Sequence, residues 1–273
     1  MVIRVCVAGA TGWTGKAVAN AVLASSEFQL TGAIARRQAG KDIGEVLGHD
    51  RINLNIVASL EEALETPTDV LIDYTGPDMV KTRILAALNK GVRVVVGTSG
   101  LTASDYADIA QRAEERKLGV IAAGNFSITA ALAKHFSLIA AQYLPSWEVI
   151  DYASATKIDA PSGTTRELAE ELATISQNHL SVSIEGTHGS KEARGATIEG
   201  TQVHSIRLPS YIIAFETIFG LPDERLSIRH DAGSSAEPYV SGTLLAVQKV
   251  MKVNGLVRGL DRLLFHSQQN DES

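Results

Sequence analysis

The chain of 273 residues contains a single cysteine, Cys6, which excludes an internal disulfide and a zinc site built on cysteines. That usage suits a reducing compartment. No apolar stretch approaches the ~20 residues needed to span a bilayer, and the opening segment MVIRVCVAGA predicts a strand instead of a signal peptide. There is no run of Lys and Arg, and 25 basic against 31 acidic residues give a net charge of −6. We therefore expect a cytoplasmic protein with neither nucleic acid nor membrane as a partner.

The first 125 residues alternate between strand-like and helix-like segments. Continuous apolar runs without polar alternation are typical of parallel strands that are covered on both faces. Such runs occupy residues 2–8, 28–35, 69–74, 92–96 and 118–122, with helical segments at 16–24, 80–89 and 103–117, and a serine-led helix start at 59–64. This order predicts an α/β fold, a Rossmann-like doubly wound parallel sheet.

The pattern changes after Asn125. A helix over residues 127–143 and another over 165–176 accompany β-like stretches at 147–154, 196–206, 212–219 and 224–229. Several strands with few helices predict a second domain of α+β type. Residues 238–265 return to helical spacing and are expected to pack against the first domain, while the polar end at 267–273 is expected to be frayed.

Three glycines, Gly9, Gly12 and Gly15, follow the first strand in GATGWTG and open the first helix. This spacing is a variant of the dinucleotide fingerprint, in which glycines permit a tight turn, approach to a pyrophosphate and close helix packing. The helix N-terminus adds partial positive charge. An ordinary tight turn would have the same spacing, but the strand–loop–helix context favours cofactor binding.

The second strand ends in Arg36 and Arg37, where NAD-binding folds place an acidic residue for the ribose hydroxyls. Two guanidinium groups suit a 2′-phosphate, so we expect NADP(H), with NAD(H) possible. The alternative is a solvated loop. Two further loops, at residues 74–77 and 97–100, follow strands and are predicted to present amides and hydroxyls to the nicotinamide half of the cofactor.

The segment KIDAPSGT at residues 157–164 places two hydroxyls and free amides at the start of a helix, with Lys157 just upstream. Such a helix start predicts a carboxylate site, although a simple proline turn with an N-cap serine would use the same residues.

Together these segments resemble the 4-hydroxy-tetrahydrodipicolinate reductase (dihydrodipicolinate reductase) family of bacterial lysine biosynthesis. The resemblance rests on VAGATGWTG at the start, VVGTSGL at 95–101, GNFSI at 124–128, KIDAPSGT at 157–164 and HSIR at 204–207. It implies a dinucleotide-binding domain over residues 1–125 plus 238–273, and a substrate-binding and oligomerisation domain with a mixed sheet over 126–237. It also implies a homotetramer and a small-molecule carboxylate substrate.

The resemblance further implies which residues bind. The cofactor would contact Gly9, Ala10, Thr11, Gly12, Trp13, Thr14, Arg36, Arg37, Thr75, Gly97, Thr98, Ser99, Ala123, Asn125 and Phe126. The substrate would contact Ser162, Gly163, Thr164 and, at the edge of its cleft, His204.

One departure concerns catalysis. Family members usually carry Glu-x-His-His before the lysine of this motif, with the first histidine as proton donor, whereas Ala153 and Ser154 fill the two histidine positions here. Ser154 is therefore expected to bind substrate, and Asp151, Tyr152 and Lys157 are the catalytic candidates. If residues 151–157 are extended, Asp151, Ala153, Ala155 and Lys157 share one face and leave space for a bulkier substrate. Tyr152, Lys157 or water would then deliver the proton.

A second departure follows HSIR, where the family's glycine-rich acidic segment is replaced by LPSY at residues 208–211. The sequence thus predicts an NADPH-dependent reductase of this type, acting on a C=N or C=C bond of the family substrate or a relative. Two alternatives stay open: a reductase for a different imine, aldehyde or oxo-acid, and a non-catalytic NADP-binding sensor. No metal is expected.

Overall fold

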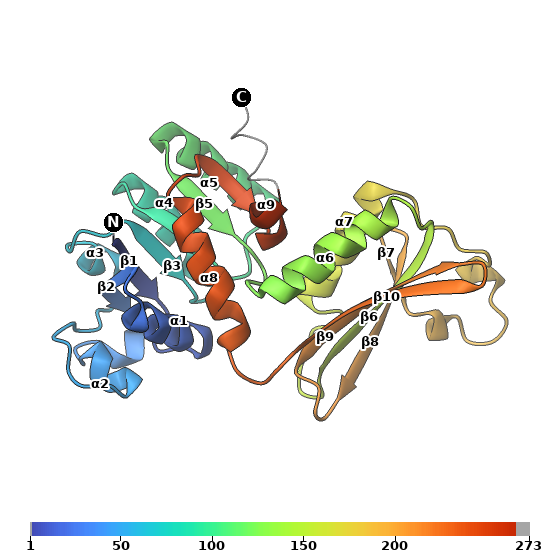
Figure 1. Cartoon of the computed structure of the whole chain (residues 1–273), viewed down its shortest axis with the longest axis horizontal. Coiled ribbons are helices and arrows are strands. Elements are labelled where there is room, and N and C mark those ends of the chain that lie inside the picture. The colour runs from blue at the N-terminus through green and yellow to red at the C-terminus, as the bar shows by residue number, and fades with distance from the viewer. Residues whose placement is uncertain (1, 266–273) are drawn as a thin grey trace. The chain divides into compact units, whose positions relative to one another are not determined.

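The computed structural model describes residues 2–265, which form two units. One unit contains the residues up to Ile128 together with those from Ala236 onward, and the other contains Thr129–Ser235. Each has its own sheet and its own helices (Figure 1). The end at residues 267–273, expected to be frayed, lies outside the described residues.

The first unit is built on a six-stranded sheet in the order β11-β5-β4-β3-β1-β2. All its pairings are parallel, as the unalternated apolar runs predict, and every residue of β3 and β5 is buried. The strands are β1 (Ile3–Ala8), β2 (Phe28–Ile34), β3 (Val70–Asp73), β4 (Arg93–Val96), β5 (Gly119–Ala122) and β11 (Gly255–Arg258). The Rossmann-like prediction is confirmed. The chain runs from β1 to β2 on one side and then to β3 on the other, which makes the ends of β1 and β3 the switch point where such sheets bind ligands.

Helices cover this sheet, and one apolar cluster, including Leu71, Ile84 and Ile109, fills the space beneath α4 and α5. The helices of the unit are α1 (Trp13–Ala24), α2 (Ile43–Leu47), α3 (Leu60–Ala63), α4 (Val80–Asn89), α5 (Ala103–Arg116), α8 (Glu237–Val250) and α9 (Leu260–Phe265), with short 3₁₀ turns η1 (Arg36–Gln38) and η2 (Pro77–Met79). Ser59 caps α3 by accepting from the Glu62 amide, as its spacing predicts.

The end of the chain corrects one expectation. Residues 238–265 were expected to be helical, but β11 interrupts them and pairs with β5 (Figure 1). Gly255 begins this strand and Gly259 directly follows it, with positive φ angles of 87° and 91°, conformations that end a helix. A four-residue strand is too short to show a period of its own.

The second unit has a mixed sheet in the order β10-β9-β6-β8-β7, in which β6 and β8 are parallel and the other neighbours are antiparallel. Its strands are β6 (Ser146–Ser154), β7 (Ala196–Ile198), β8 (Thr201–Leu208), β9 (Ile213–Leu221) and β10 (Glu224–Ala232). Its longer helices are α6 (Ile128–Ala141) and α7 (Gly163–Ile175), with η3 (Ile184–Gly186) and η4 (Lys191–Arg194) in the loop before β7.

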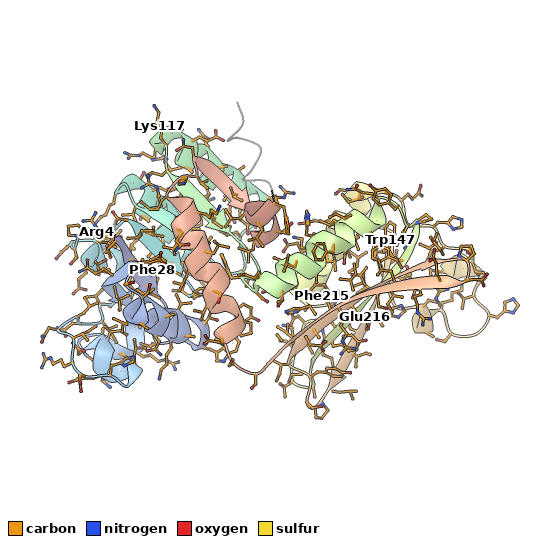
Figure 2. All side chains as sticks on the ribbon, viewed as in Figure 1. Arg4, Phe28, Lys117, Trp147, Phe215 and Glu216 are labelled. Carbon is orange, nitrogen blue, oxygen red and sulfur yellow. The ribbon has the colours of Figure 1, made fainter. Side chains whose placement is uncertain are left out.

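One face of this sheet packs on α6 and α7. Trp147 and Phe215, labelled in Figure 2, form a core there with Leu168 and Leu172 of α7. Since strand residues alternate between faces, the odd-numbered residues of β6 face the helices and the even-numbered ones face away. This alternation decides below which predicted site residues lie together.

The expected single strand at 196–206 is instead a hairpin of β7 and β8. Glu199 and Gly200 form its turn with φ angles of 45° and 82°. Two successive residues with positive φ are typical of the tightest hairpin turns.

Candidate active site

The glycine loop has the geometry of a cofactor cradle. Gly9 has a φ of 82°, and a Cβ there would lie 2.2 Å from the carbonyl oxygen of Tyr74. A Cβ on Gly15 would lie 2.0 Å from the Gly9 carbonyl oxygen, so the helix start lies directly against the loop. The N-cap residue Gly12 offers no side-chain cap to α1. The first amides of α1 therefore remain available to a phosphate.

The remaining loop residues differ in their exposure. Ala10 is fully buried and its amide donates to the Ile34 carbonyl oxygen at 3.3 Å. Thr11 and Thr14 are half-buried beside the open helix start. Trp13 is 57% exposed, and its ring meets the edge of Tyr239 at a centroid distance of 5.7 Å. Tyr239 thus supports Trp13 next to the loop.

Arg36 and Arg37 begin η1 directly after β2, and both are exposed. Among residues 2–265, no carboxylate forms an ion pair with either guanidinium. Because no carboxylate of the described chain pairs with them, these two arginines suit a phosphate of a ligand.

The loops after β3 and β4 are tied to Asp73, which is fully buried. Its Oδ1 accepts hydrogen bonds from the Thr75 amide (3.0 Å), the Thr75 hydroxyl (2.6 Å) and the Thr98 hydroxyl (2.8 Å). Both hydroxyls thus donate their hydrogens to Asp73, and the contact of these loops with the nicotinamide stays a prediction. Gly97 lies against the ring of Tyr74, where a Cβ would approach to 2.2 Å, and Ser99 is exposed.

The segment after β5 is largely internal. The Ala123 amide donates to the Val96 carbonyl oxygen at 3.1 Å, and Asn125 accepts from the Ser127 amide at 2.8 Å. Phe126 is 1% exposed and its ring packs on Tyr74. Phe126 therefore supports the loops from the core.

In the second unit, Asp151 organises the start of α7. It is fully buried, and its carboxylate accepts from the Ser162 amide (3.0 Å), the Ser162 hydroxyl (2.7 Å) and the Thr165 hydroxyl (3.0 Å). Arg207 of β8 donates to the same carboxylate at 2.7 Å and to the Asp159 carbonyl oxygen at 2.6 Å. Burial acts to raise the pKa of Asp151, but the hydrogen bonds from Ser162 and Arg207 outweigh it and hold the pKa below its ordinary value.

These contacts decide what the loop offers to a ligand. Ser162 caps α7 and donates its hydroxyl hydrogen to Asp151, so its side chain is bonded within the protein and does not face a ligand. The amides of Gly163 and Thr164, in the first turn of α7, have no acceptor within the helix. They are the groups at this helix start that remain for an anion. Arg207 and Thr165 are partners of Asp151 that the sequence did not single out as site residues. Arg207 reaches Asp151 through the pairing of β6 with β8, which becomes visible only in the fold, and Thr165 reaches it from the first turn of α7.

The segment after β6 corrects a further expectation. β6 ends at Ser154 and the chain turns at residues 155–156, so residues 151–157 are not one extended strand. Ala153 is fully buried and Ala155 is exposed, which leaves no shared open face beside Lys157. Ser154 bonds Thr156 through their hydroxyls at 2.9 Å. Lys157 forms an ion pair with Asp159 at 2.8 Å, within the loop that leads to Ser162.

Two predicted residues lie on the other face of the sheet from Asp151. The Tyr152 hydroxyl donates to Glu216 at 3.0 Å, and burial together with Glu216 raises the pKa of Tyr152. His204 contacts Glu148 at 2.7 Å. The fold therefore brings Asp151, Ser162, Gly163, Thr164 and the Lys157 loop together, and places Tyr152 and His204 elsewhere.

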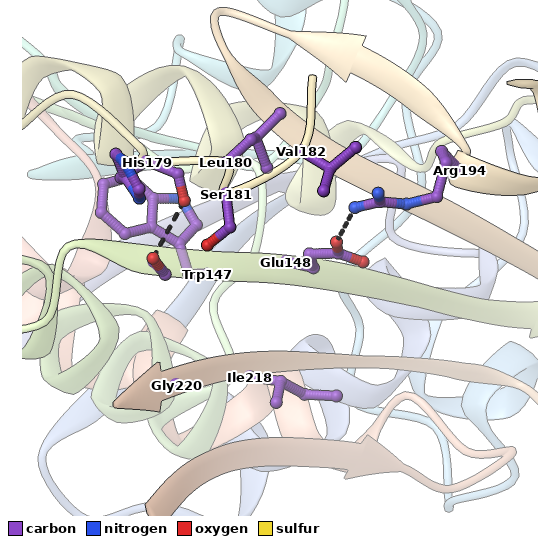
Figure 3. Close-up of a pocket in the computed structure, with 10 residues that line it drawn as sticks. Trp147, Glu148, His179, Leu180, Ser181, Val182, Arg194, Ile218 and Gly220 are labelled. Carbon is purple, nitrogen blue, oxygen red and sulfur yellow. Dashed lines mark hydrogen bonds and ion pairs between the residues drawn. The ribbon is translucent and has the colours of Figure 1, made fainter. Parts of the chain in front are cut away.

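Figure 3 shows a cavity of about 420 Å³ that is lined from β6 by its first three residues, 146–148, whereas Asp151 lies nearer the other end of that strand. Trp147, Leu180 and Val182 line it, and Glu148 forms an ion pair with Arg194 at 2.6 Å across its rim. Its charged groups are satisfied by one another, and none belongs to the Asp151 cluster.

Within the described part of the chain, no helix is long and apolar enough to cross a membrane. Over the same residues, no group of three or more His, Cys, Asp or Glu side chains is placed to hold a metal ion.

The first unit has a doubly wound sheet, and the helix that follows its glycine loop has no side-chain cap. The second unit has a helix start whose free amides suit an anion. These are the features of an oxidoreductase that depends on a nicotinamide nucleotide. The chain belongs to the dihydrodipicolinate reductase family. The family model described as "Dihydrodipicolinate reductase, N-terminus" matches residues 3–126, and the one described as "C-terminus" matches residues 126–264. It is therefore a reductase of the dihydrodipicolinate reductase type.

Individual relatives agree with this assignment. The chain is 38% identical to a 4-hydroxy-tetrahydrodipicolinate reductase of Desulfitobacterium hafniense, covering 96% of this chain and 98% of the relative. It is 37% identical to the Bacillus pumilus enzyme over similar shares, 96% and 98%. Among solved structures, a dipicolinate-bound dihydrodipicolinate reductase from Paenisporosarcina has a TM-score of 0.84 at 31% identity, covering 96% of this chain and all (100%) of that one. An amine dehydrogenase from Mycobacterium smegmatis, with a TM-score of 0.65 at 16% identity, shares the fold.

Proposed function

We propose that this chain uses NADPH to reduce 4-hydroxy-tetrahydrodipicolinate, or a close relative of it, in lysine biosynthesis. The observation that carries the proposal is the helix start at α7, where Asp151 fixes Ser162 and leaves the amides of Gly163 and Thr164 for an anion. A helix N-terminus stabilises carboxylates. The names of the curated relatives support the same substrate.

The first unit is proposed to hold the cofactor. The open amides of α1 suit the pyrophosphate, and the unpaired guanidinium groups of Arg36 and Arg37 suit a 2′-phosphate. NADPH is therefore proposed over NADH. The loops after β3, β4 and β5, with Thr75, Gly97 to Ser99 and Ala123 to Phe126, would hold the nicotinamide end. Bound NADPH supplies the hydride for the C=N or C=C bond of the substrate.

The second unit is proposed to hold the substrate carboxylate on Gly163 and Thr164 and to offset its charge with Lys157. Reduction also needs one proton. With Ala153 and Ser154 at the usual histidine positions, and with Tyr152 bonded to Glu216 on the other face, we propose that Lys157 or a water delivers it. Asp151 is proposed to position the loop, because all its contacts are internal. The expected homotetramer and the expected cytoplasmic location stay predictions.

The test follows NADPH oxidation with freshly generated hydroxy-tetrahydrodipicolinate, comparing the wild type with Lys157→Ala. Lys191→Ala is the matched control, because Lys191 is also ion-paired within the second unit, to Glu185, but lies outside the Asp151 cluster. Loss of a proton donor and charge partner should lower kcat/KM by ~10²–10⁴-fold in Lys157→Ala. The control should keep wild-type turnover.

Other outcomes separate the alternatives. Unchanged turnover in Lys157→Ala would remove the role of that lysine. NADPH binding without turnover of this substrate would favour a different imine or oxo-acid, and binding without turnover of any such compound would favour the sensor. The same assay with NADH checks the proposed preference set by Arg36 and Arg37.

A further inference from the structure

A buried ion pair lies at the switch point of the first unit and takes no part in the function proposed above. Asp73 is the last residue of β3 and is fully buried, and its Oδ2 accepts from Arg83 Nε at 2.7 Å. Arg83 comes from α4, and its side chain is 17% exposed. A partner from a neighbouring helix thus neutralises a carboxylate inside the sheet edge that binds ligands in this fold.

The same ion pair connects the two loops that follow β3 and β4. Asp73 takes the hydroxyl hydrogens of Thr75 and Thr98, and the Thr75 amide also donates to the Thr98 hydroxyl at 2.9 Å. Arg83 in turn donates to the Thr75 hydroxyl oxygen and to the Gly76 carbonyl oxygen. Neither loop can move without breaking bonds to this pair.

The charge of this ion pair bears on which redox state of the nucleotide the site prefers. A nicotinamide ring is neutral when reduced and carries a positive charge when oxidised. An uncompensated carboxylate beneath the loops would favour the oxidised ring, because opposite charges attract strongly where water is excluded. The Arg83 guanidinium cancels that charge, so the pair is nearly neutral toward the ring.

We infer that Arg83 is a positioning residue that neutralises Asp73 beneath the Thr75 and Thr98 loops and so keeps this carboxylate from shifting the nucleotide preference of the site toward the oxidised form. This inference rests on the proposed use of these loops at the nicotinamide end of NADP(H). Arg83 acts through Asp73 and Thr75 and needs no contact of its own with the cofactor.

The test measures the dissociation constants of NADPH and of NADP⁺ separately, without substrate, by titration calorimetry. In Arg83→Gln the ratio of the NADP⁺ constant to the NADPH constant should fall on the order of tenfold, because the carboxylate loses its countercharge. In Asp73→Asn the ratio should rise, because the lone guanidinium then disfavours the oxidised ring. Arg83→Lys should restore the wild-type ratio.

Opposite shifts of this ratio in the two single variants cannot come from loosened loops, because loosened loops would weaken the binding of both nucleotides alike. The double variant Asp73→Asn/Arg83→Gln has no lone buried charge, so it should fold and return to the wild-type ratio. Lys81→Met is the matched control, since it removes a cation from the same helix that pairs with Asp105 and Asp108. Its ratio should be that of the wild type.

The inference is overturned if both single variants bind NADPH and NADP⁺ more weakly to the same degree. It is also overturned if the double variant keeps a shifted ratio of the two dissociation constants. A wild type that binds neither nucleotide overturns both this inference and the proposed cofactor. A wild type that binds both nucleotides but turns over no dicarboxylate removes only the proposed substrate, and the ratio still decides the role of Arg83.

Discussion

At the scale of single residues, Asp151 is the side chain on which the second unit's site depends. Its carboxylate is fully buried and holds Ser162, Thr165 and Arg207. Asp151→Asn keeps the size but leaves Arg207 without its countercharge and turns an amide toward donors. We expect the free energy of unfolding at pH 7, measured in urea, to fall by about 3 kcal/mol. NADPH affinity should not change, because the cofactor residues belong to the other unit.

The pH dependence of this loss follows from the pKa of Asp151, which hydrogen bonding holds below its ordinary value of 3.8. A carboxyl whose pKa is lower in the folded than in the unfolded chain stabilises the fold above the unfolded pKa and loses this stabilisation as the pH falls. The difference between wild type and variant should therefore shrink below about pH 4. Asp159→Asn, at a half-exposed carboxylate, is the control. An equal loss in the control would contradict the special role of Asp151.

Residue-scale inference from the sequence succeeded where the chemistry is local. The turn at Gly9, the close helix start at Gly15 and the cap at Ser162 involve neighbours in the chain, and spacing predicts them. Arg207 lies 56 residues from Asp151 and reaches it only through the pairing of β6 with β8. No local pattern reports that register. The same limit hid the bond between Tyr152 and Glu216 and the bond from the Thr98 hydroxyl to Asp73.

At the scale of elements, α5 shows how a helix start is secured. The Thr102 hydroxyl accepts from the Asp105 amide while the Asp105 carboxylate accepts from the Thr102 amide, a complete capping box. Thr102→Ala should cost about 1 kcal/mol of unfolding free energy in urea, since one helix amide loses its acceptor. Thr174→Ala, in the exposed last turn of α7, is the control: it removes an exposed hydrogen bond to the Glu171 carbonyl oxygen but leaves every helix amide its acceptor, so it should cost much less. Equal losses would show that the cap contributes little.

Helix α5 also carries a carboxylate, Asp105, whose ionisation should affect stability in acid. The Lys81 ammonium and the bonds from Thr102 lower the pKa of Asp105 to about 2 from its ordinary 3.8. Its stabilising effect is complete above about pH 4 and is lost as the pH falls toward 2. Asp105→Asn should therefore unfold less steeply with acid over this range, as followed by circular dichroism. A curve parallel to that of the wild type would contradict the assignment.

The presence of strands in each region was easier to predict from the sequence than how many strands each region contains. The strands β1 to β5 were predicted because buried parallel strands are continuous apolar runs, whereas the short helix α2 was not predicted. The strand β11 was missed since its four residues, which begin with Gly255 and end just before Gly259, carry no period, and β7 merged with β8 since their turn is only Glu199 and Gly200. Both corrections arise from backbone conformation, which composition reports weakly.

At the scale of the whole molecule, each unit has its own core and one tryptophan: Trp13 is exposed in the first, and Trp147 is 2% exposed in the second. In Trp13→Phe, fluorescence therefore reports the second unit alone. A ligand stabilises only the cooperative unit that binds it, by about 2.7 kcal/mol at 100 times its Kd. NADPH at that multiple of the variant's own Kd should delay the loss of far-UV circular dichroism from the first unit in urea but leave the Trp147 transition unchanged. A Trp147 transition that shifts by the full amount would show that the two units unfold as one.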